Sequence, residues 1–152
     1  MPKPFLAALP VYNEATSVDE VLDEVTRYCD HVLVVDDRST DGTSERLAER
    51  VAARDDILLV EHPENQGYGA ALFTAFEYAS ENNFDIIVTI DCDGQHEPQR
   101  IQQFVTQAEN TGADIISGSR YLETFDADTP PPVERRRINY EVTQLLNDRL
   151  KL

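Results

Sequence analysis

The sequence has only two cysteines and two lysines among its 152 residues, and long apolar runs are absent. Cys29 and Cys92 show no zinc-ligand spacing with histidine, and we expect both to be free thiols because the polar first residues do not resemble an export signal. No apolar stretch approaches the roughly 18 residues of a membrane span. The composition therefore favours a globular domain over a disulfide scaffold, a zinc module or a membrane-spanning protein.

Positive charge is also scarce, since 13 Lys and Arg residues face 29 Asp and Glu residues and the net charge is −16. Such a field repels polyanions, so we expect no nucleic-acid partner. It also repels the phosphates of a nucleotide. A phosphate-bearing ligand would need a metal ion or a local arginine cluster to offset the field.

What the sequence does contain is a regular alternation of apolar strand patterns and helical stripes. Five strands are expected near residues 5–9, 31–35, 57–60, 85–90 and 113–117, with amphipathic helices between them. Repeated strand-helix-strand units indicate a mostly parallel sheet with helices on both faces. The expected fold class is therefore α/β, with three layers.

Polar loops follow each of these strands, and in a parallel sheet such loops meet at one edge. They span residues 10–14, 36–42, 61–68, 91–97 and 118–121. If the first and fourth strands are neighbours where the strand order reverses, Glu14 and Asp91 flank the crevice directly.

The loop after the fourth strand has the clearest chemistry. It reads Asp91-Cys92-Asp93-Gly94-Gln95-His96. Asp91, Asp93 and the Gln95 carbonyl are hard oxygen ligands for Mg²⁺ or Mn²⁺ that leave room for a diphosphate. The alternative is a pair of turn and cap residues. His96 has no assigned role.

Two earlier loops suit a nucleotide base. Tyr12 offers a ring face, and Asp37 can accept a hydrogen bond from a base N–H. The plainer alternatives are edge packing for Tyr12, and an Asx turn and helix cap for Asp36 to Asp41. Residues 65–71, Asn-Gln-Gly-Tyr-Gly-Ala-Ala, open a helix with two glycines that permit close approach of a ligand.

Together these segments resemble glycosyltransferase family 2, which has a nucleotide-diphospho-sugar transferase fold of the GT-A, Rossmann-like type. The motifs are Pro10-Val11-Tyr12-Asn13-Glu14, Val35 to Thr43, Asn65 to Ala71, Asp91 to His96 and Gly118-Ser119-Arg120-Tyr121. The Asp-x-Asp-Gly-Gln-His motif and the Gly-Ser-Arg-Tyr motif that follows it are most similar to those of the branch of dolichol-phosphate mannosyltransferases and polyprenyl-phosphate glycosyltransferases.

The resemblance implies a role for each matching residue. Those assigned to the nucleotide sugar are Pro10, Tyr12, Glu14, Val35, Asp37, Asp91, Cys92 through its backbone, Asp93 and Arg120. Those assigned to the metal are Asp91, Asp93 and Gln95. Arg120 is assigned to the donor phosphate or sugar, and these four residues together form the implied catalytic set.

The resemblance also implies the reaction. A sugar would pass from a GDP- or UDP-sugar to a polyprenyl phosphate with inversion, assisted by Mg²⁺ or Mn²⁺. The lipid phosphate is already an anionic nucleophile, so the chain needs no Ser/His or Cys/His pair. We expect a cytoplasmic protein, either free or peripheral to the cytoplasmic face of a membrane where the acceptor lies.

The C-terminal part completes the expected organisation of one GT-A catalytic domain over residues 1–152, truncated at its C-terminus. It comprises a nucleotide-sugar-binding core (1–121), a mobile proline-rich loop (122–133) and an acceptor-side helix (134–152). Arg135, Arg136 and Arg137 stand where the helix dipole is already positive, which indicates either pairing with neighbouring glutamates or an acceptor-phosphate site.

Several other functions stay open at this point. They are a family 2 enzyme with a saccharide acceptor in cell-wall or polysaccharide synthesis, and a non-catalytic nucleotide-binding fragment. A haloacid-dehalogenase phosphatase fits less well, because its Asp-x-Asp motif follows the first strand and needs a lysine partner, whereas the lysines here are Lys3 and Lys151. A nucleotidyltransferase that makes nucleotide sugars also fits less well, because no Gly-rich, Arg-bearing loop follows the first strand of this chain.

Overall fold

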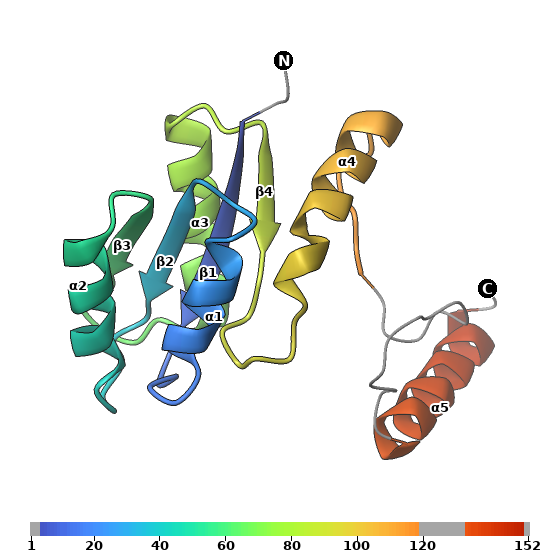
Figure 1. Cartoon of the computed structure of the whole chain (residues 1–152). Coiled ribbons are helices and arrows are strands. Elements are labelled where there is room, and N and C mark those ends of the chain that lie inside the picture. The colour runs from blue at the N-terminus through green and yellow to red at the C-terminus, as the bar shows by residue number, and fades with distance from the viewer. Residues whose placement is uncertain (1–3, 119–132, 151–152) are drawn as a thin grey trace. The chain divides into compact units, whose positions relative to one another are not determined.

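The computed structural model describes residues 4–118 and 133–150, and within the second range it describes the side chains of residues 137, 138, 140–145 and 149. The chain divides into two compact units, Met1–Ile116 and Ser117–Leu152. The first unit contains the sheet and its covering helices, and the second contains helix α5 (Val133–Leu150) (Figure 1). The expected mobile loop lies outside the described residues, apart from Val133, which begins α5.

Four strands form one parallel sheet in the order β3-β2-β1-β4. They are β1 (Phe5–Val11), β2 (Val32–Asp36), β3 (Ile57–Glu61) and β4 (Ile86–Thr89), each within two residues of the predicted strand. Ala7 lies opposite Val32 on one side and Val88 on the other, so β1 stands in the middle with a neighbour at each edge. The first and fourth strands are therefore neighbours, which is the condition under which Glu14 and Asp91 flank the crevice.

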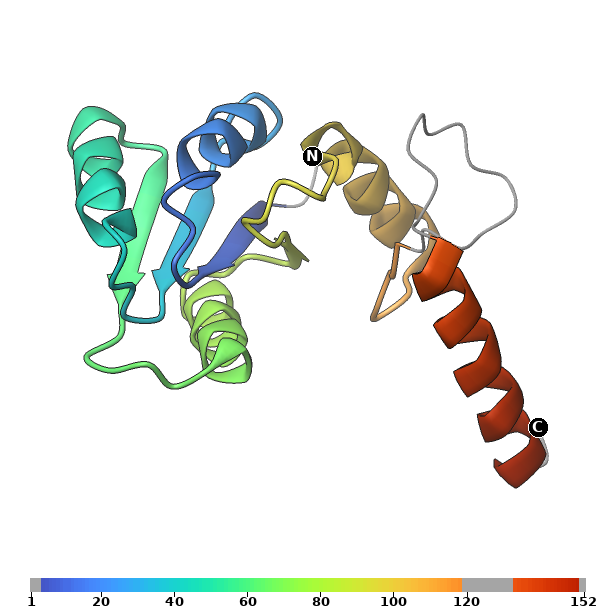
Figure 2. The same cartoon turned by 90° about the horizontal axis from the view of Figure 1, so that it is seen from below.

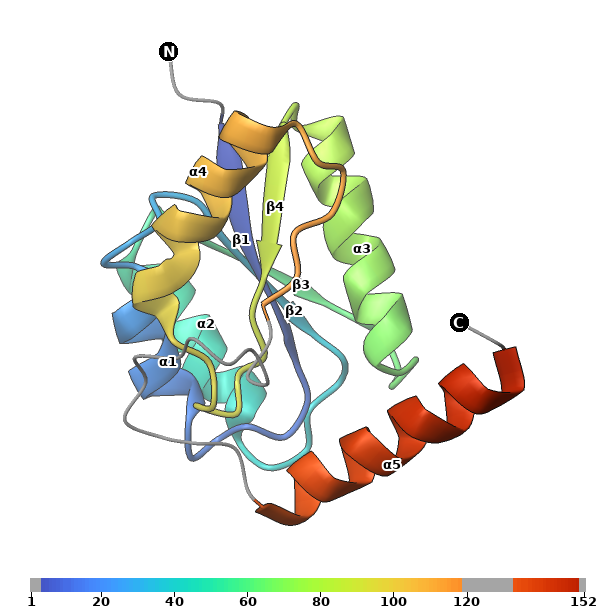
Figure 3. The same cartoon turned by 90° about the vertical axis from the view of Figure 1, so that its right-hand side faces the viewer.

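Helices cover both faces of this sheet, as predicted (Figures 2 and 3). One face carries α1 (Val18–Val25), α2 (Thr43–Ala53) and α4 (Ile101–Thr111), which a short 3₁₀ turn (Pro98–Arg100) precedes; the other carries α3 (Tyr68–Glu81). Alternate residues of β1 enter the two cores, because successive strand side chains point to opposite faces.

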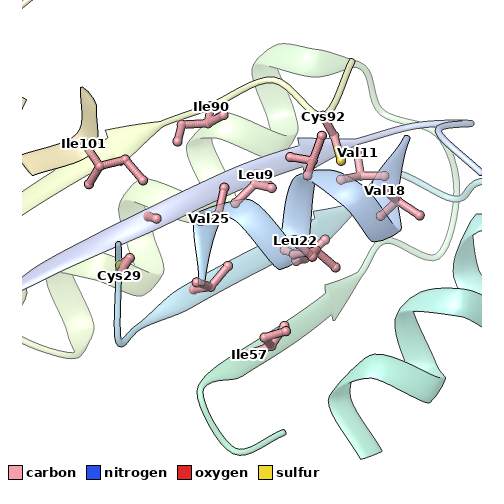
Figure 4. Close-up of a cluster of buried hydrophobic side chains, with 14 of the residues drawn as sticks. Leu9, Val11, Val18, Leu22, Val25, Cys29, Ile57, Ile90, Cys92 and Ile101 are labelled. Atoms are coloured by element: carbon pink, nitrogen blue, oxygen red, sulfur yellow. The ribbon is translucent and has the colours of Figure 1, made fainter. Parts of the chain in front are cut away.

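The two cores differ in the size of their side chains. Leu9, Val11, Leu22 and Ile101 belong to the larger cluster between the sheet and α1 (Figure 4). On the opposite face α3 presents alanines at positions 71, 75 and 79, all buried, so its backbone can approach the sheet closely. That close approach brings the first turn of α3 to the carboxyl ends of β1 and β2.

The predicted fifth strand near Ala113–Ser117 is wrong, because residues 112–118 have no regular secondary structure. Ile115 is 85% exposed, and no described strand pairs with the outer edge of β4. Apolar, β-branched composition favours a strand only when a neighbour supplies the hydrogen-bond ladder. Within the described residues this segment lacks such a neighbour.

The described apolar residues of α5 are exposed. Ile138, Tyr140, Val142 and Leu145 each have at least 47% of their surface accessible. Across the described parts of the chain, we find no helix with both the length and the apolar character that a bilayer crossing requires.

Candidate functional site

A cleft of about 420 Å³ opens at the carboxyl ends of the strands. Its lining comes from the end of β1, the loops after all four strands and the start of α3: Pro10, Val11, Tyr12, Glu14, Asp37, Asn65, Gly67, Tyr68, Ala71, Asp91, Cys92 and Asp93. Glu14 follows β1 and Asp91 follows β4, and both line this cleft. The reversal of strand order between β1 and β4 thus produces the hollow, as it does in open α/β sheets generally.

The loops after β1 and β2 are fastened to each other by side-chain hydrogen bonds. The backbone N–H of Asn13 donates to Ser39 Oγ (2.9 Å), and the Thr40 N–H donates back to Asn13 Oδ1 (2.7 Å). The N–H of Glu14 donates to Thr43 Oγ1 (2.9 Å). Asn13 adopts a left-handed backbone (φ 58°), which its short polar side chain tolerates. These bonds hold Tyr12 and Glu14 at the cleft without a ligand.

The two adjacent aspartates after β2 have different tasks. Asp36 is buried and accepts hydrogen bonds from the Ser39 N–H (3.0 Å) and the Ser44 hydroxyl (2.5 Å), so the turn interpretation holds for it. Asp37 is buried too, but it lines the cleft. Its Oδ1 accepts from the Gln66 N–H (2.8 Å), and its Oδ2 accepts from the Gly67 N–H (2.7 Å).

A third donor, buried His62, also contacts Asp37. His62 Nδ1 lies 2.7 Å from Asp37 Oδ1, and because a carboxylate only accepts, Nδ1 carries the proton. His62 Nε2 lies 2.9 Å from the Thr74 hydroxyl on α3. Burial alone would raise the pKa of Asp37, but the Gln66 amide, His62 and the Gly67 amide outweigh it and hold that pKa below its ordinary value.

Tyr68, the first residue of α3, reaches across the cleft to the loop after β4. Its hydroxyl donates to Asp91 Oδ1 (2.9 Å). Desolvation, followed by the bond to Asp91, raises the pKa of Tyr68 to about 12, so the phenol keeps its proton and remains a donor. Asp91 is therefore held by a residue that is 23 positions away in the sequence.

The loop after Asp91 is arranged as a tight turn. The Gln95 N–H donates to Asp93 Oδ1 (2.9 Å), and Gly94 has φ +72°, a conformation that suits glycine. His96 Nδ1 accepts the backbone N–H of Asp91 (3.2 Å). Cys92 is buried beneath the cleft, and burial followed by the carboxylates of Glu14, Asp93 and Asp91 raises its pKa to about 12, so it is a neutral thiol.

The structure brings together seven of the residues predicted from the sequence. Pro10, Tyr12, Glu14, Asp37, Asp91, Cys92 and Asp93 all line the one cleft. Val35 does not, because its side chain is fully buried between the sheet and α3. Gln95 is exposed next to the cleft but is not part of its lining.

Of the predicted arginines, Arg137 is the one whose side chain the structure describes. Arg120 is outside the described residues, as are the side chains of Arg135 and Arg136. Arg137 is exposed on α5, and its Nε donates to Glu141 Oε1 (2.7 Å) in the expected pairing with a glutamate.

Two polar residues that contact the site were missed by the sequence reasoning. Tyr68 lies inside the glycine-containing segment that was singled out, and its position as the first residue of a helix at the sheet edge is the signal that would have found it. His62 gives no such signal. It follows β3 in a segment without a motif, and only the fold shows that it meets Asp37.

The residues present fit a divalent metal whose coordination shell the substrate would complete. Among the described side chains, no group of three or more His, Cys, Asp and Glu converges as a metal cage. Asp91 and Asp93 line the same cleft, and Asp91 keeps 42% of its side chain accessible. Mg²⁺ is typically held by one or two carboxylates plus substrate phosphates rather than by a protein cage. Two carboxylates beside an open cleft meet that requirement.

Comparison with known proteins agrees with this arrangement. The sequence model described as glycosyl transferase family 2 matches residues 7–151, nearly the whole chain. The chain belongs to this family. A polyprenol monophosphomannose synthase of Mycolicibacterium smegmatis is 34% identical over 120 residues, which is 77% of this chain and 45% of the relative. An undecaprenyl-phosphate mannosyltransferase of Micrococcus luteus is 32% identical over 117 residues, 76% of this chain and 47% of the relative.

A solved structure supports the family 2 fold. A mannosyltransferase from Pyrobaculum calidifontis, in complex with GDP-Man and Mn²⁺, superposes with a TM-score of 0.54 at 33% identity and covers 61% of this chain and 28% of that one. The expected GT-A fold class is confirmed. The chain spans about half the length of the curated relatives it matches.

The hydrogen bonds of Asp37 lead to a stability prediction. Asp37→Asn should lower the free energy of unfolding by about 1–3 kcal/mol at neutral pH, because an amide nitrogen would then face a buried N–H. The folded pKa of Asp37 is lowered, so its contribution is full above the unfolded value of about 3.9 and is lost as the pH falls through the folded pKa. Urea unfolding should show the difference from wild type above about pH 5 and its narrowing below about pH 4. A constant difference down to pH 2 would contradict this account.

Proposed function

We propose that this chain carries the donor-binding machinery of an inverting glycosyltransferase, which moves a sugar from a GDP- or UDP-sugar to a polyprenyl phosphate. The observation that carries the proposal is the single cleft that gathers Tyr12, Glu14, Asp37, Asp91 and Asp93 from separate strand ends. The relatives named as polyprenyl-phosphate mannosyltransferases and the GDP-Man complex of the P. calidifontis enzyme support the choice of substrates.

The donor nucleotide would lie with its base at the loops after β1 and β2. Tyr12 is 47% exposed, which leaves a ring face for a base. Asp37 already accepts three hydrogen bonds, two at Oδ1 and one at Oδ2, so Oδ2 retains one acceptor position for a base N–H. Pro10 and Glu14, which line the cleft, complete the wall beside the ribose.

The diphosphate would lie at the loop after β4. Asp91, Asp93 and the Gln95 carbonyl would hold Mg²⁺ or Mn²⁺, which when bound neutralises the leaving nucleoside diphosphate. The Cys92 backbone and Arg120 are the remaining proposed donor contacts. In a chain of net charge −16, an anionic donor needs these cations to enter an acidic cleft.

The transfer itself asks little covalent chemistry of the protein. An oxygen of the acceptor phosphate attacks the anomeric carbon, and the bond from that carbon to the diphosphate oxygen breaks, with its electron pair leaving on the nucleoside diphosphate. The acceptor oxygen carries no proton, so no general base is required. The chain's contribution is to orient the donor and stabilise the leaving group.

The acceptor phosphate is assigned to Arg135, Arg136 and Arg137, three consecutive cations in an otherwise acidic chain. They lie in the first turns of α5, where backbone N–H groups also favour an anion. Arg137 has an exposed partner in Glu141, and an exposed ion pair of this kind is easily exchanged for a phosphate.

The metal requirement gives the test of the proposed donor site. Calorimetry with GDP and UDP should show binding in Mn²⁺ that largely disappears in EDTA. Asp93→Asn should weaken the metal-dependent part, while Asp114→Asn, an exposed aspartate beyond α4, serves as the matched control. Equal nucleotide affinity with Mn²⁺ and with EDTA would refute the metal assignment.

A second experiment tests the acceptor assignment. The triple variant Arg135/Arg136/Arg137→Glu should bind a short polyprenyl phosphate at least tenfold more weakly, since each lost charge-assisted contact is worth about 1.5–3 kcal/mol. Donor nucleotide affinity should not change. Arg149→Glu, near the other end of α5, is the control for a change of net charge. Wild-type affinity for the lipid phosphate in the triple variant would remove these arginines from the site.

A further inference from the structure

The first residue of α3 and the two residues before it join the two sides of the cleft. The backbone N–H groups of Gln66 and Gly67 donate to Asp37, at the end of β2. The next residue, Tyr68, sends its hydroxyl to Asp91 Oδ1, beyond the end of β4. Three consecutive residues therefore connect the carboxylate on the base side with the carboxylate on the metal side.

The hydrogen bonds that fix this segment to Asp37 are buried, whereas the Asp91 carboxylate at its other end is accessible to solvent. Asp37 and His62 are 3% and 7% exposed, so the bonds that fix Gln66 and Gly67 are shielded from water. Asp91 has 42% of its side chain accessible. His96 Nε2 lies 3.7 Å from Asp91 Oδ2, too far for a hydrogen bond. The Tyr68 hydroxyl therefore supplies a hydrogen bond that orients the Asp91 carboxylate.

We propose that Tyr68 is a positioning residue for the metal ligand Asp91, fixed in place by the Asp37 contacts of Gln66 and Gly67. This inference rests on the proposed function, since it takes Asp91 to be a metal ligand. A hydroxyl donor on Oδ1 occupies one acceptor position and leaves Oδ2 and the second lone pair of Oδ1 available. Donors of this kind orient a ligand and tune its affinity, and their removal typically costs 10–100-fold in metal affinity.

The bond from Tyr68 to Asp91 allows metal affinity to be tested separately from nucleotide affinity. Tyr68→Phe keeps the ring and the backbone contacts of the helix start, so the base side of the cleft is unchanged. Only the bond to Asp91 is lost. Metal affinity should fall while affinity for the nucleotide without metal stays the same, a split that a general loss of structure would not produce.

The test is calorimetric titration of the 152-residue chain with Mn²⁺ alone, followed by titration with GMP and UMP in EDTA. These two nucleotides lack the diphosphate whose binding needs the metal, and so they report on the base side alone. Tyr68→Phe should raise the Mn²⁺ dissociation constant about 10–100-fold and leave the nucleotide values within twofold. Tyr78→Phe is the matched control on the same helix, because its ring packs against Phe84 away from the cleft. Thermal unfolding should be the same for Tyr68→Phe and wild type, since the Tyr68 side chain is largely exposed.

Asp91→Asn distinguishes the failure of this inference from the failure of the proposed function. If Asp91→Asn loses Mn²⁺ binding and Tyr68→Phe keeps the wild-type value, Tyr68 has no positioning role and the metal site stands. If wild type shows no saturable Mn²⁺ binding, or Asp91→Asn binds as wild type does, the metal site is wrong and the role of Tyr68 falls with it.

Discussion

Strand β1 has to pair with β2 on one side and with β4 on the other, and this constraint shapes the rest of the first unit. The chain leaves β1 through α1 and α2 on one face and returns through α3 on the opposite face. From β1 the chain crosses over to β2 on one side of the sheet, and later from β3 to β4 on the other side. The loops after β1 and β4 therefore diverge, and a cleft opens between them. The larger hydrophobic core supports this hollow from below, with Cys92 and Val11 buried beneath it.

Hydrogen bonds then turn a hollow into an ordered site. The loops after β1 and β2 are joined through Asn13, and the loop before α3 is joined to β2 through Asp37. An unpaired buried carboxylate would be costly, but Asp37 accepts three bonds and keeps one acceptor position towards the cleft. The site is thus arranged before a ligand arrives, which would lower the entropy cost of binding the proposed nucleotide sugar.

Much of this organisation follows from the sequence, for a physical reason. Strand and helix periods are local, and parallel strands deliver their following loops to one edge whatever their separation in the chain. That is why the shared lining by Tyr12, Glu14, Asp37, Asp91 and Asp93 could be predicted. The meeting of His62 with Asp37 depends on side-chain direction, which no pattern encodes. The strand expected near residues 113–117 failed because a strand also needs a partner.

The most direct test of the central claim, that metal and nucleotide bind together where β1 and β4 diverge, is paramagnetic relaxation by Mn²⁺ in NMR spectra of the chain with GDP or UDP. The account predicts selective broadening of backbone N–H signals at Asn13, Gly67 and Cys92, with His31 and Asp85 at the opposite ends of the strands unaffected. Broadening centred instead on the second hollow, which Glu20 and Glu24 of α1 and Glu97 line, or broadening at the cleft that added nucleotide does not strengthen, would contradict it.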